Sequence, residues 1–246
     1  MNLILLESEE ISDRRDVVVS GARADHLRHV LHVEIGHEVR VGLLDGPRGV
    51  ARVESIAEAS IALRCTFDDE IPPRPHVDLL LAVPRPKVLR RLWAQIAAVG
   101  VGQIILTNAE KVERNYFDTH ILSPDTYRPL LIEGLQQSRD TRLPSVSIHR
   151  QFRPLIEDHL DTLLGDGLRV VADPSATTSL GEVVRASGAE RMLLAIGPEG
   201  GWNAFELGLL ESHGFQKAGI GRRTLRTDTA CVAALAVAYS AVRISS

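Results

Sequence analysis

Short apolar runs separated by turn residues dominate the first part of the chain. Residues 39–44 and 50–56 flank Asp45-Gly46, a dipeptide typical of the tight turn in a β-hairpin. Residues 24–33 break this pattern, because their apolar side chains fall on one helical face. The pattern therefore predicts a small β-barrel that includes a single helix. Further strands of this barrel are predicted at residues 3–6, 17–19 and 60–67.

Residues 68–75 contain three prolines and three acidic residues without any periodicity, which marks a linker. Beyond it, apolar strand-like runs alternate with segments of helical length. Strands that alternate with helices favour a parallel sheet covered on both faces, so an α/β domain is predicted here. The strands are predicted at residues 77–83, 103–106, 145–149, 168–172, 192–196 and 216–220. The helices are predicted at residues 87–99, 124–138, 154–164, 179–187, 204–212 and 228–242.

The composition, with 44% hydrophobic and 24% charged residues, is typical of a soluble globular protein. No run reaches the ~20 apolar residues of a membrane helix, and the N-terminus lacks the features of a signal peptide. Cys65 and Cys231 stand far apart without metal-ligand spacing, so neither a disulfide nor a metal site is expected. We therefore expect a cytoplasmic protein without a membrane partner.

The formal net charge of −4 argues against a protein that holds nucleic acid by bulk positive charge. Any RNA contact therefore has to be local. One candidate is the start of the first helix of the α/β domain, where Arg85, Lys87, Arg90 and Arg91 lie close together. Contact with RNA phosphate is slightly favoured there over a plain amphipathic helix, because several of these cations share one exposed flank.

The most informative run follows the strand predicted at residues 192–196. The loop from Gly197 to Gly201 contains three glycines, and it leads into Asn203 and Glu206, whose spacing matches a capping box. A glycine-rich loop at the carboxyl end of a parallel strand lets backbone groups approach a ligand closely. A tight strand-to-helix turn without a ligand explains the glycines equally well. The run is neither a GxGxxG motif nor a P-loop.

A second run, residues 218–230, again combines a strand, a glycine turn and the start of a helix. Asp228 suits the positive N-terminal end of that helix. Arg222, Arg223 and Arg226 crowd the turn and could bind an anionic ligand or RNA phosphate, although a solvated basic loop is more common. The helix beyond is nearly uncharged, which predicts burial in the core or at a subunit interface.

Together these two runs resemble the two signature motifs of the family of 16S rRNA uridine-N3 methyltransferases. The matching segments are residues 196–201 and 221–230, with further similarity at residues 25–31, 106–112 and 136–139. The resemblance implies a small PUA-like, RNA-binding β-barrel at residues 1–70 and an α/β SPOUT methyltransferase domain at residues 76–246. It also implies a C-terminal trefoil knot and a homodimer, and neither follows from the strand pattern.

On this resemblance, S-adenosylmethionine is the expected cofactor, and 16S rRNA in the small ribosomal subunit is the expected partner. Backbone groups would read the adenine, and apolar side chains would enclose it. The residues implied in cofactor binding are Ala172, Ile196, Gly197, Pro198, Glu199, Gly200, Gly201, Ile220, Gly221, Leu225, Arg226, Thr227, Thr229 and Ala230. The residues expected to contact RNA are Arg23, His26, Arg28, Arg85, Lys87, Arg90, Arg91, Arg139, Arg142, Arg222 and Arg223.

The chemistry of the implied reaction selects candidate catalytic residues. Uridine N3 carries a proton and must lose it to become nucleophilic, so a base, or a cation that stabilises the uracil anion, is needed. Arg226 is the candidate for stabilising the anion, and Glu199 or Asp228 is the candidate proton acceptor. A helix-start carboxylate and a capping residue are equally good interpretations of Glu199 and Asp228.

Several positions depart from the family's pattern, namely Gln95, Ala98, Asp140, Asn203 and Asp228. They leave open a paralogue of the same superfamily that methylates a different RNA site, such as a ribose in tRNA. A non-catalytic RNA-binding assembly factor is a second alternative, and affinity for the cofactor distinguishes it. A dinucleotide oxidoreductase is least favoured, because no glycine fingerprint follows the first α/β strand.

Overall fold

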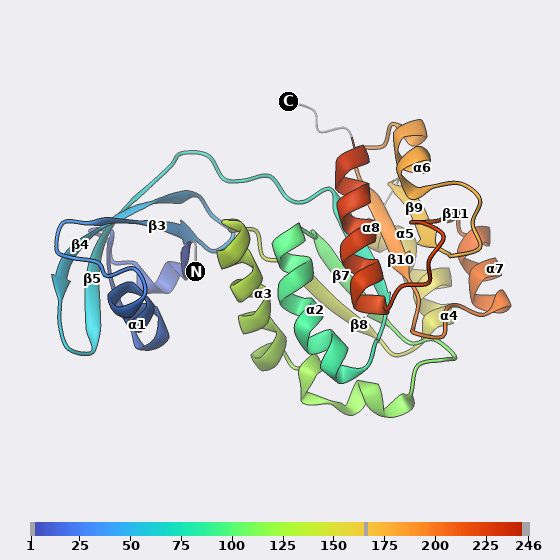
Figure 1. The fold of residues 1–246 in the computed structure, drawn as a ribbon, viewed down its shortest axis with the longest axis horizontal. Coiled ribbons are helices and arrows are strands. Elements are labelled where there is room, and N and C mark those ends of the chain that lie inside the picture. The colour runs from blue at the N-terminus through green and yellow to red at the C-terminus, as the bar shows by residue number, and fades with distance from the viewer. Residues whose placement is uncertain (1–2, 165–166, 243–246) are drawn as a thin grey trace. The chain divides into compact units, whose positions relative to one another are not determined.

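The computed structural model describes residues 3–164 and 167–242 of the 246-residue chain. The chain divides into two compact units (Figure 1). The first unit contains residues 1–74 and 131–143, and the second contains residues 75–130 and 144–246. The division between residues 130 and 131 falls inside helix α3 (Pro124–Ser138), so one helix contributes to both units.

The first unit is built on a curled sheet that has five strands in the described part of the chain. Its strand order is β1-β3-β4-β5-β2, in which β1 pairs in parallel with β3 and the other neighbours are antiparallel. The predicted turn at Asp45-Gly46 connects β3 to β4. The strands are β1 (Ile4–Leu6), β2 (Asp16–Ser20), β3 (Glu38–Leu43), β4 (Arg48–Ile56) and β5 (Ser60–Phe67).

Alternation along the strands gives this sheet one buried face. In β5, Ile61, Leu63 and Cys65 point into the core while the residues between them are less buried. A short 3-10 turn, η1 (Ser8–Glu10), precedes β2, and helix α1 (Gly21–His29) follows β2. The first unit therefore has a hydrophobic core of its own, formed by the sheet and α1.

Helix α1 lies nearer the N-terminus than its sequence pattern predicts, because it already begins at Gly21 instead of at residue 24. It ends at His29 instead of at residue 33, and Val30 is 60% exposed. The chain leaves the helical path because His32 has a φ of 48°, a left-handed conformation that cannot continue a right-handed helix. The predicted end of this helix is therefore wrong.

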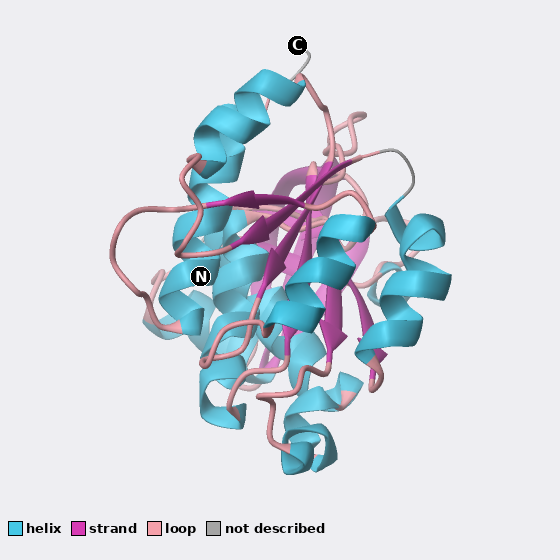
Figure 2. Cartoon of the chain, turned by 90° about the vertical axis from the view of Figure 1, so that its right-hand side faces the viewer, coloured by secondary structure: helices cyan, strands magenta, loops and turns pink. Residues whose placement is uncertain are grey.

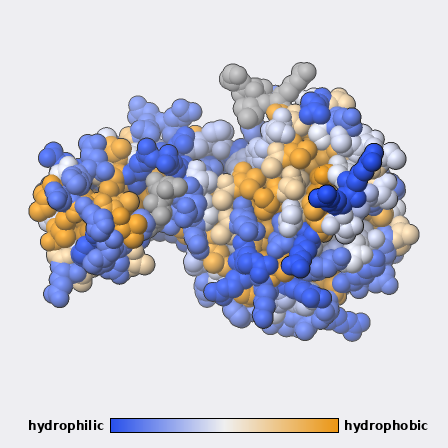
Figure 3. Space-filling view, in the orientation of Figure 1, coloured by the Kyte–Doolittle hydropathy of each residue, from blue (hydrophilic) through white to orange (hydrophobic). Residues whose placement is uncertain are grey.

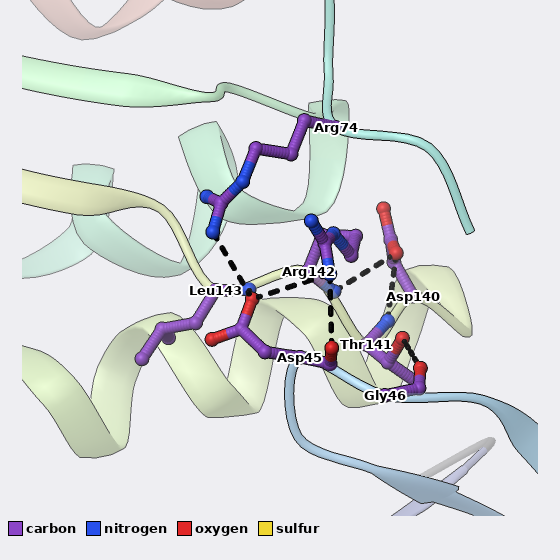
Figure 4. A network of polar contacts seen from close by, with 7 residues as sticks. All are labelled: Asp45, Gly46, Arg74, Asp140, Thr141, Arg142 and Leu143. Carbon is purple, nitrogen blue, oxygen red and sulfur yellow. Dashed lines mark hydrogen bonds and ion pairs between the residues drawn. The ribbon is translucent and has the colours of Figure 1, made fainter. Parts of the chain in front are cut away.

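Residues 139–143, which follow α3, are tied to the β3–β4 turn by a polar network (Figure 4). The buried hydroxyl of Thr141 donates to the carbonyl oxygen of Gly46 at 2.6 Å, and the Asp45 N–H donates to the Thr141 carbonyl at 2.8 Å. Arg142 Nη1 donates to the Asp45 carbonyl oxygen at 2.9 Å. These contacts explain why a segment remote in sequence belongs to the first unit.

The second unit contains a six-stranded sheet in the described residues, with the order β11-β9-β10-β6-β7-β8. All neighbouring strands are parallel. The central strands β6 and β10 are buried at every position, as expected for strands covered on both faces. The strands are β6 (Val77–Ala82), β7 (Gln103–Thr107), β8 (Ser145–His149), β9 (Leu168–Ala172), β10 (Met192–Ile196) and β11 (Gln216–Ala218).

Helices lie on both faces of this sheet (Figure 2), and α8 packs against α2 and α6. The predicted α/β organisation with a parallel sheet is confirmed. No described helix combines the length and the apolar composition needed to cross a membrane. Besides α3, the helical segments are α2 (Pro86–Val99), η2 (Arg114–Asp118), η3 (His120–Leu122), α4 (Phe152–Pro154), η4 (Leu155–His159), α5 (Leu160–Leu164), α6 (Leu180–Ser187), α7 (Ala204–Ser212) and α8 (Thr227–Ala241).

Candidate functional site

Three neighbouring strands, β11, β9 and β10, end at the same edge of the parallel sheet. The chain continues from β6 to β7 on one side of the sheet and from β10 to β11 on the other, so the strand order reverses between β6 and β10. In open α/β sheets, ligands bind outside the carboxyl ends of the strands at such a reversal. The loops that follow these three strands are residues 173–179, 197–203 and 219–226.

The loop after β10 is shaped by glycine and by a helix cap. Gly201 has a φ of 70°, a conformation that favours glycine. Asn203 is the N-cap of α7, and its Oδ1 accepts the Glu206 N–H at 2.7 Å. The Asn203 N–H donates in turn to Glu206 Oε2 at 2.8 Å. The predicted capping box is thus confirmed, and it fixes where the loop ends.

Glu206 also joins this loop to the loop after β7. Its side chain is buried, and its second oxygen, Oε1, accepts the Glu110 N–H at 2.7 Å. Both oxygens therefore bind backbone N–H groups, which offsets the cost of burying the carboxylate. In addition, Lys111 Nζ donates to the carbonyl oxygen of Gly200 at 2.7 Å. These contacts hold the backbone of the glycine loop in place.

The loops after β9 and β11 are joined to each other through Gly219. Its N–H donates to the Thr178 carbonyl at 2.9 Å, and its carbonyl accepts the Leu180 N–H at 2.8 Å. Gly221, two residues later, has a φ of 133°, which L-residues with a side chain rarely adopt. The loop ends at Arg226, the N-cap of α8.

A cavity of about 340 Å³ lies between these three loops. Its lining contains most of the residues implied in cofactor binding, and it also contains Arg223, which was expected to contact RNA. Among the described residues, Arg226 and Thr229 are the predicted cofactor residues outside the lining. The predicted residues on the lining are Ala172, Ile196, Gly197, Pro198, Glu199, Gly200, Gly201, Ile220, Gly221, Leu225, Thr227 and Ala230.

Trp202 lines this cavity although its sequence context did not single it out. The residue is 8% exposed, and its indole Nε1 is buried without a hydrogen-bond partner in the part of the chain that the structure describes. A Cβ on Gly197 would lie 3.1 Å from that nitrogen, so the glycine allows the indole to pack against the loop. The sequence feature that could have identified Trp202 is its position as an aromatic residue directly after Gly201, the last glycine of the loop.

The three candidate catalytic residues have different surroundings. Glu199 lines the cavity, and its Oε1 accepts the Arg85 N–H at 3.2 Å. Asp228 Oδ2 accepts from Arg91 Nη2 at 3.0 Å, and this hydrogen bond holds the pKa of Asp228 below its ordinary value. The guanidinium of Arg226 is exposed and has no partner among the described residues, and both of its sequence neighbours line the cavity.

Of the four predicted cations at the start of α2, Arg85 interacts through its side chain with the hydroxyl of Tyr116, and the other three divide into two groups. Arg91 is bound to Asp228, as described above. Lys87 and Arg90 are exposed, and neither side chain has a partner within residues 3–164 and 167–242. These two cations are free to bind a phosphate.

On α1, the predicted RNA-contacting arginines already have protein partners. Arg23 forms an ion pair with Glu10, and Arg28 Nη2 donates to the Ala57 carbonyl at 2.6 Å. Both interactions hold α1 against neighbouring segments of the first unit. His26 is half-buried, and its Nε2 has no partner in the described residues.

Arg139 and Arg142 lie three residues apart but differ in their contacts. The Arg142 side chain is 15% exposed and is held by Asp45 (Figure 4). Arg139 is exposed, has a φ of 61° and lines a cavity of about 520 Å³ on the first unit, together with Leu31 and Arg40. Its guanidinium makes no hydrogen bond or ion pair to a described residue, so Arg139 is the more available of the two.

Comparison with known proteins assigns the family. The model of the RNA methyltransferase domain matches residues 72–239, which is more than half of the chain. The ribosomal RNA small subunit methyltransferase E of Treponema pallidum is 32% identical over 244 residues, covering 96% of this chain and 90% of the relative. The chain belongs to the ribosomal RNA small subunit methyltransferase E family. The family predicted from the two motifs is thereby confirmed.

Two further members of the methyltransferase E family extend the comparison. Methyltransferase E 1 of Borreliella burgdorferi is 24% identical over 245 residues, which cover 98% of each chain. The crystal structure of methyltransferase E from Neisseria gonorrhoeae, bound to S-adenosylmethionine, has a TM-score of 0.78 at 21% identity and covers 98% of both chains. The similarity shows the same fold, a parallel-sheet α/β unit with a curled β-sheet.

In the described residues, no group of three His, Cys, Asp or Glu side chains is placed to hold a metal ion.

Proposed function

We propose that this protein transfers a methyl group from S-adenosylmethionine to N3 of a uridine in the 16S rRNA of the small ribosomal subunit. The observation that carries the proposal is the cavity at the carboxyl ends of β9, β10 and β11, because both family motifs line it. The Treponema pallidum relative, which is similar over nearly its whole length, is named a ribosomal RNA small subunit methyltransferase.

The residues of the cavity fit this cofactor on three counts. A volume of about 340 Å³ lies within the range of about 300–1,000 Å³ of small-molecule sites. The buried Nε1 of Trp202 is a donor that an acceptor on a ligand would satisfy. Gly201 and Gly221, where an added Cβ would meet no atom within 4 Å, leave the loop backbone open to close approach.

S-adenosylmethionine supplies, when bound, a methyl group that is already activated on a positively charged sulfur. The main task of the protein is therefore to position the two reactants. Ile196, Ile220 and Leu225 provide apolar walls, and the loop backbone provides hydrogen-bonding groups. Lys111 and Glu206 keep that backbone in one conformation, so little has to be ordered when the cofactor binds.

Removal of the N3 proton is the step that needs charged groups. We assign stabilisation of the uracil anion to Arg226, which is exposed, lies between two lining residues in the sequence and has no side-chain partner among the described residues. We assign proton acceptance to Glu199, which lines the cavity. Asp228 is less suitable, because the hydrogen bond from Arg91 lowers its pKa and thereby its basicity.

For the RNA, we assign phosphate contacts to Lys87, Arg90, Arg139 and Arg222. Their side chains are exposed and are not bound to any described residue. Phosphate contacts from such cations position the nucleic acid without reading its sequence. Arg23, Arg28, Arg91 and Arg142 would first have to leave a protein partner.

We also propose that the first unit is a PUA-like RNA-binding domain, that the C-terminal segment is knotted, and that the protein forms a homodimer in the cytoplasm. The path of α8 supports the knot, because the chain returns from β11 at the sheet edge to pack against α2, β6 and β10. Support for the dimer comes from the outer side of α8, where Ala233, Ala236 and Val237 are partly exposed and where Figure 3 shows apolar surface.

A methyl-transfer assay tests the function. Small ribosomal subunits from cells that lack this protein are incubated with the protein and S-adenosylmethionine carrying a tritiated methyl group, and the RNA is digested to nucleosides. We expect labelled 3-methyluridine. A ribose-methylated nucleoside would instead indicate the alternative SPOUT reaction. Absence of cofactor binding in calorimetry would indicate a non-catalytic RNA-binding factor.

A further inference from the structure

A second cavity, of about 410 Å³, lies on the second unit beside the glycine loop. Residues from the loop after β7, from α4 and from the start of α7 line it, among them Asn108, Arg114 and Phe205. No described residue lines both this cavity and the cofactor cavity. The second cavity is therefore a separate site next to the first.

An aromatic pair forms the wall between the two cavities. Trp202 lines the cofactor cavity, Phe152 lines the second cavity, and their ring centroids lie 5.2 Å apart. The same two regions are joined by the Lys111 and Glu206 contacts to the backbone of Gly200 and Glu110. The two cavities are therefore separated by this pair of aromatic rings.

Phe205 gives the second cavity an exposed aromatic ring. It lies in the first turn of α7 and is 61% exposed. Leaving a large apolar side chain in water sacrifices the free energy that its burial would contribute. In proteins that bind single-stranded nucleic acid, exposed aromatic faces serve as platforms on which unpaired bases stack.

Two polar groups complete the chemistry of this cavity. Asn108 Oδ1 is buried and has no partner in the part of the chain that is described, so an acceptor is left unsatisfied. The Arg114 side chain is exposed and is likewise unpaired within the described ranges. The arrangement thus combines an aromatic face, a hydrogen-bond acceptor and a cation.

The remaining charged groups on the lining are already bound. Both oxygens of Glu206 accept backbone N–H groups, and Arg153 Nε donates to both carboxylate oxygens of Glu157 at 2.9 Å. Glu110 accepts from the Asn203 amide. Among the lining residues, the exposed ring of Phe205, the buried Oδ1 of Asn108 and the guanidinium of Arg114 are therefore not bound to another described residue.

We propose that the second cavity binds one unpaired nucleotide of the substrate RNA, adjacent in the strand to the nucleotide that is methylated. Its base stacks on Phe205, an N–H group of the base edge donates to Asn108 Oδ1, and a neighbouring phosphate lies near Arg114. The identification of the RNA rests on the function proposed above. The site holds the strand beside the cofactor cavity and so contributes to positioning the target base.

Binding of a fluorescently labelled decauridylate to the full-length protein tests this site. We expect Phe205→Ala to raise the Kd by about fivefold or more, because stacking is lost, whereas Phe205→Tyr stays within about twofold of the wild type. Arg114→Ala should lower the slope of log Kd against log salt concentration by about 0.7, the value for one single-strand phosphate. Leu209→Ala, at a partly exposed apolar residue of the same helix that lines neither cavity, serves as the control and should leave the Kd unchanged.

Cofactor affinity, measured on the same variants by calorimetry, separates a local role from damage to the fold. We expect Phe205→Ala to bind S-adenosylmethionine like the wild type and to raise KM for small subunits more than it lowers kcat. An unchanged decauridylate Kd in Phe205→Ala, or a parallel loss of cofactor affinity, would overturn the proposal. If the wild type binds decauridylate through Phe205 but methylates no small subunit, the nucleotide site stands and the proposed function fails.

Discussion

The cavity proposed to bind the cofactor depends largely on backbone groups, whereas the surface proposed to bind RNA phosphate depends on charged side chains. Backbone groups and apolar side chains of three loops enclose the cavity, and its shape depends on glycines such as Gly197 and Gly221. The side chains proposed to contact phosphate, by contrast, are long and cationic, such as those of Lys87 and Arg139 on separate elements. A site made of backbone requires a contiguous motif, whereas a cationic surface requires only that some side chains remain unpaired.

Removal of the Arg226 guanidinium should have the largest effect on catalysis. We expect Arg226→Ala to lower kcat by about 100-fold, because stabilisation of the developing anion is lost. Arg222→Ala, a neighbouring cation of the same loop, should change RNA affinity and leave kcat nearly unchanged. Single-turnover methylation with saturating RNA measures the difference. A full rate in Arg226→Ala would show that this residue has no catalytic role.

The second largest effect is expected from strain in the backbone that lines the cavity. At a φ of 133°, Gly221→Ala forces an L-residue into a conformation that costs about 1–3 kcal/mol, and we expect cofactor affinity to fall about tenfold. Gly188→Ala is the matched control, because Gly188 also has a positive φ, 63°, but lies outside the cavity lining. Calorimetric titration with S-adenosylmethionine compares the two. Equal losses of affinity would mean that general destabilisation explains the effect.

The cationic surface should respond to substitution less strongly. We expect Arg139→Ala to weaken binding of the small subunit about fivefold and to reduce the salt dependence by about one phosphate contact. Arg142→Ala should instead lower the free energy of unfolding by about 1 kcal/mol, because the hydrogen bond to the Asp45 carbonyl is lost. Filter binding at several salt concentrations and urea unfolding distinguish these roles. Loss of stability in Arg139→Ala without loss of RNA binding would contradict the assignment.

The Arg91–Asp228 pair should give the smallest effect. The pKa of Asp228 is lowered in the folded protein by the hydrogen bond from Arg91, so the pair stabilises the fold above the ordinary carboxyl pKa of about 3.9. This contribution is lost as the pH falls through the lowered pKa. We expect Asp228→Asn to cost about 0.5 kcal/mol at neutral pH and to approach wild-type stability in strong acid. Urea unfolding across that pH range measures the difference, and a cost independent of pH would exclude the ion pair as its cause.

Local patterns allowed the α/β organisation and the glycine loop to be predicted. The uninterrupted apolar runs of β6 and β10 match strands buried on both faces, and the spacing of Asn203 and Glu206 gave the capping box. The loops that line the cavity were singled out because each of them is a contiguous motif. Features of this kind depend only on residues that are close in the chain.

Features that depend on contacts between remote residues were not predictable. Arg91 and Asp228 are 137 positions apart, so nothing near either residue shows that the arginine is already paired. The association of residues 139–143 with the first unit depends on Thr141, whose hydroxyl binds the Gly46 carbonyl. From the sequence, Trp202 resembles any buried aromatic residue, and only the structure shows that it lines the cavity.

The discontinuous first unit has a consequence for the order of events during synthesis. Proteins are made from the N-terminus, and domains generally fold as units while the chain grows. The five strands of the first unit end at Phe67, but the partners of the β3–β4 turn, Thr141 and Arg142, are translated much later. On the ribosome, the last hydrogen bonds of the N-terminal sheet therefore cannot form until more than half of the chain has been synthesised.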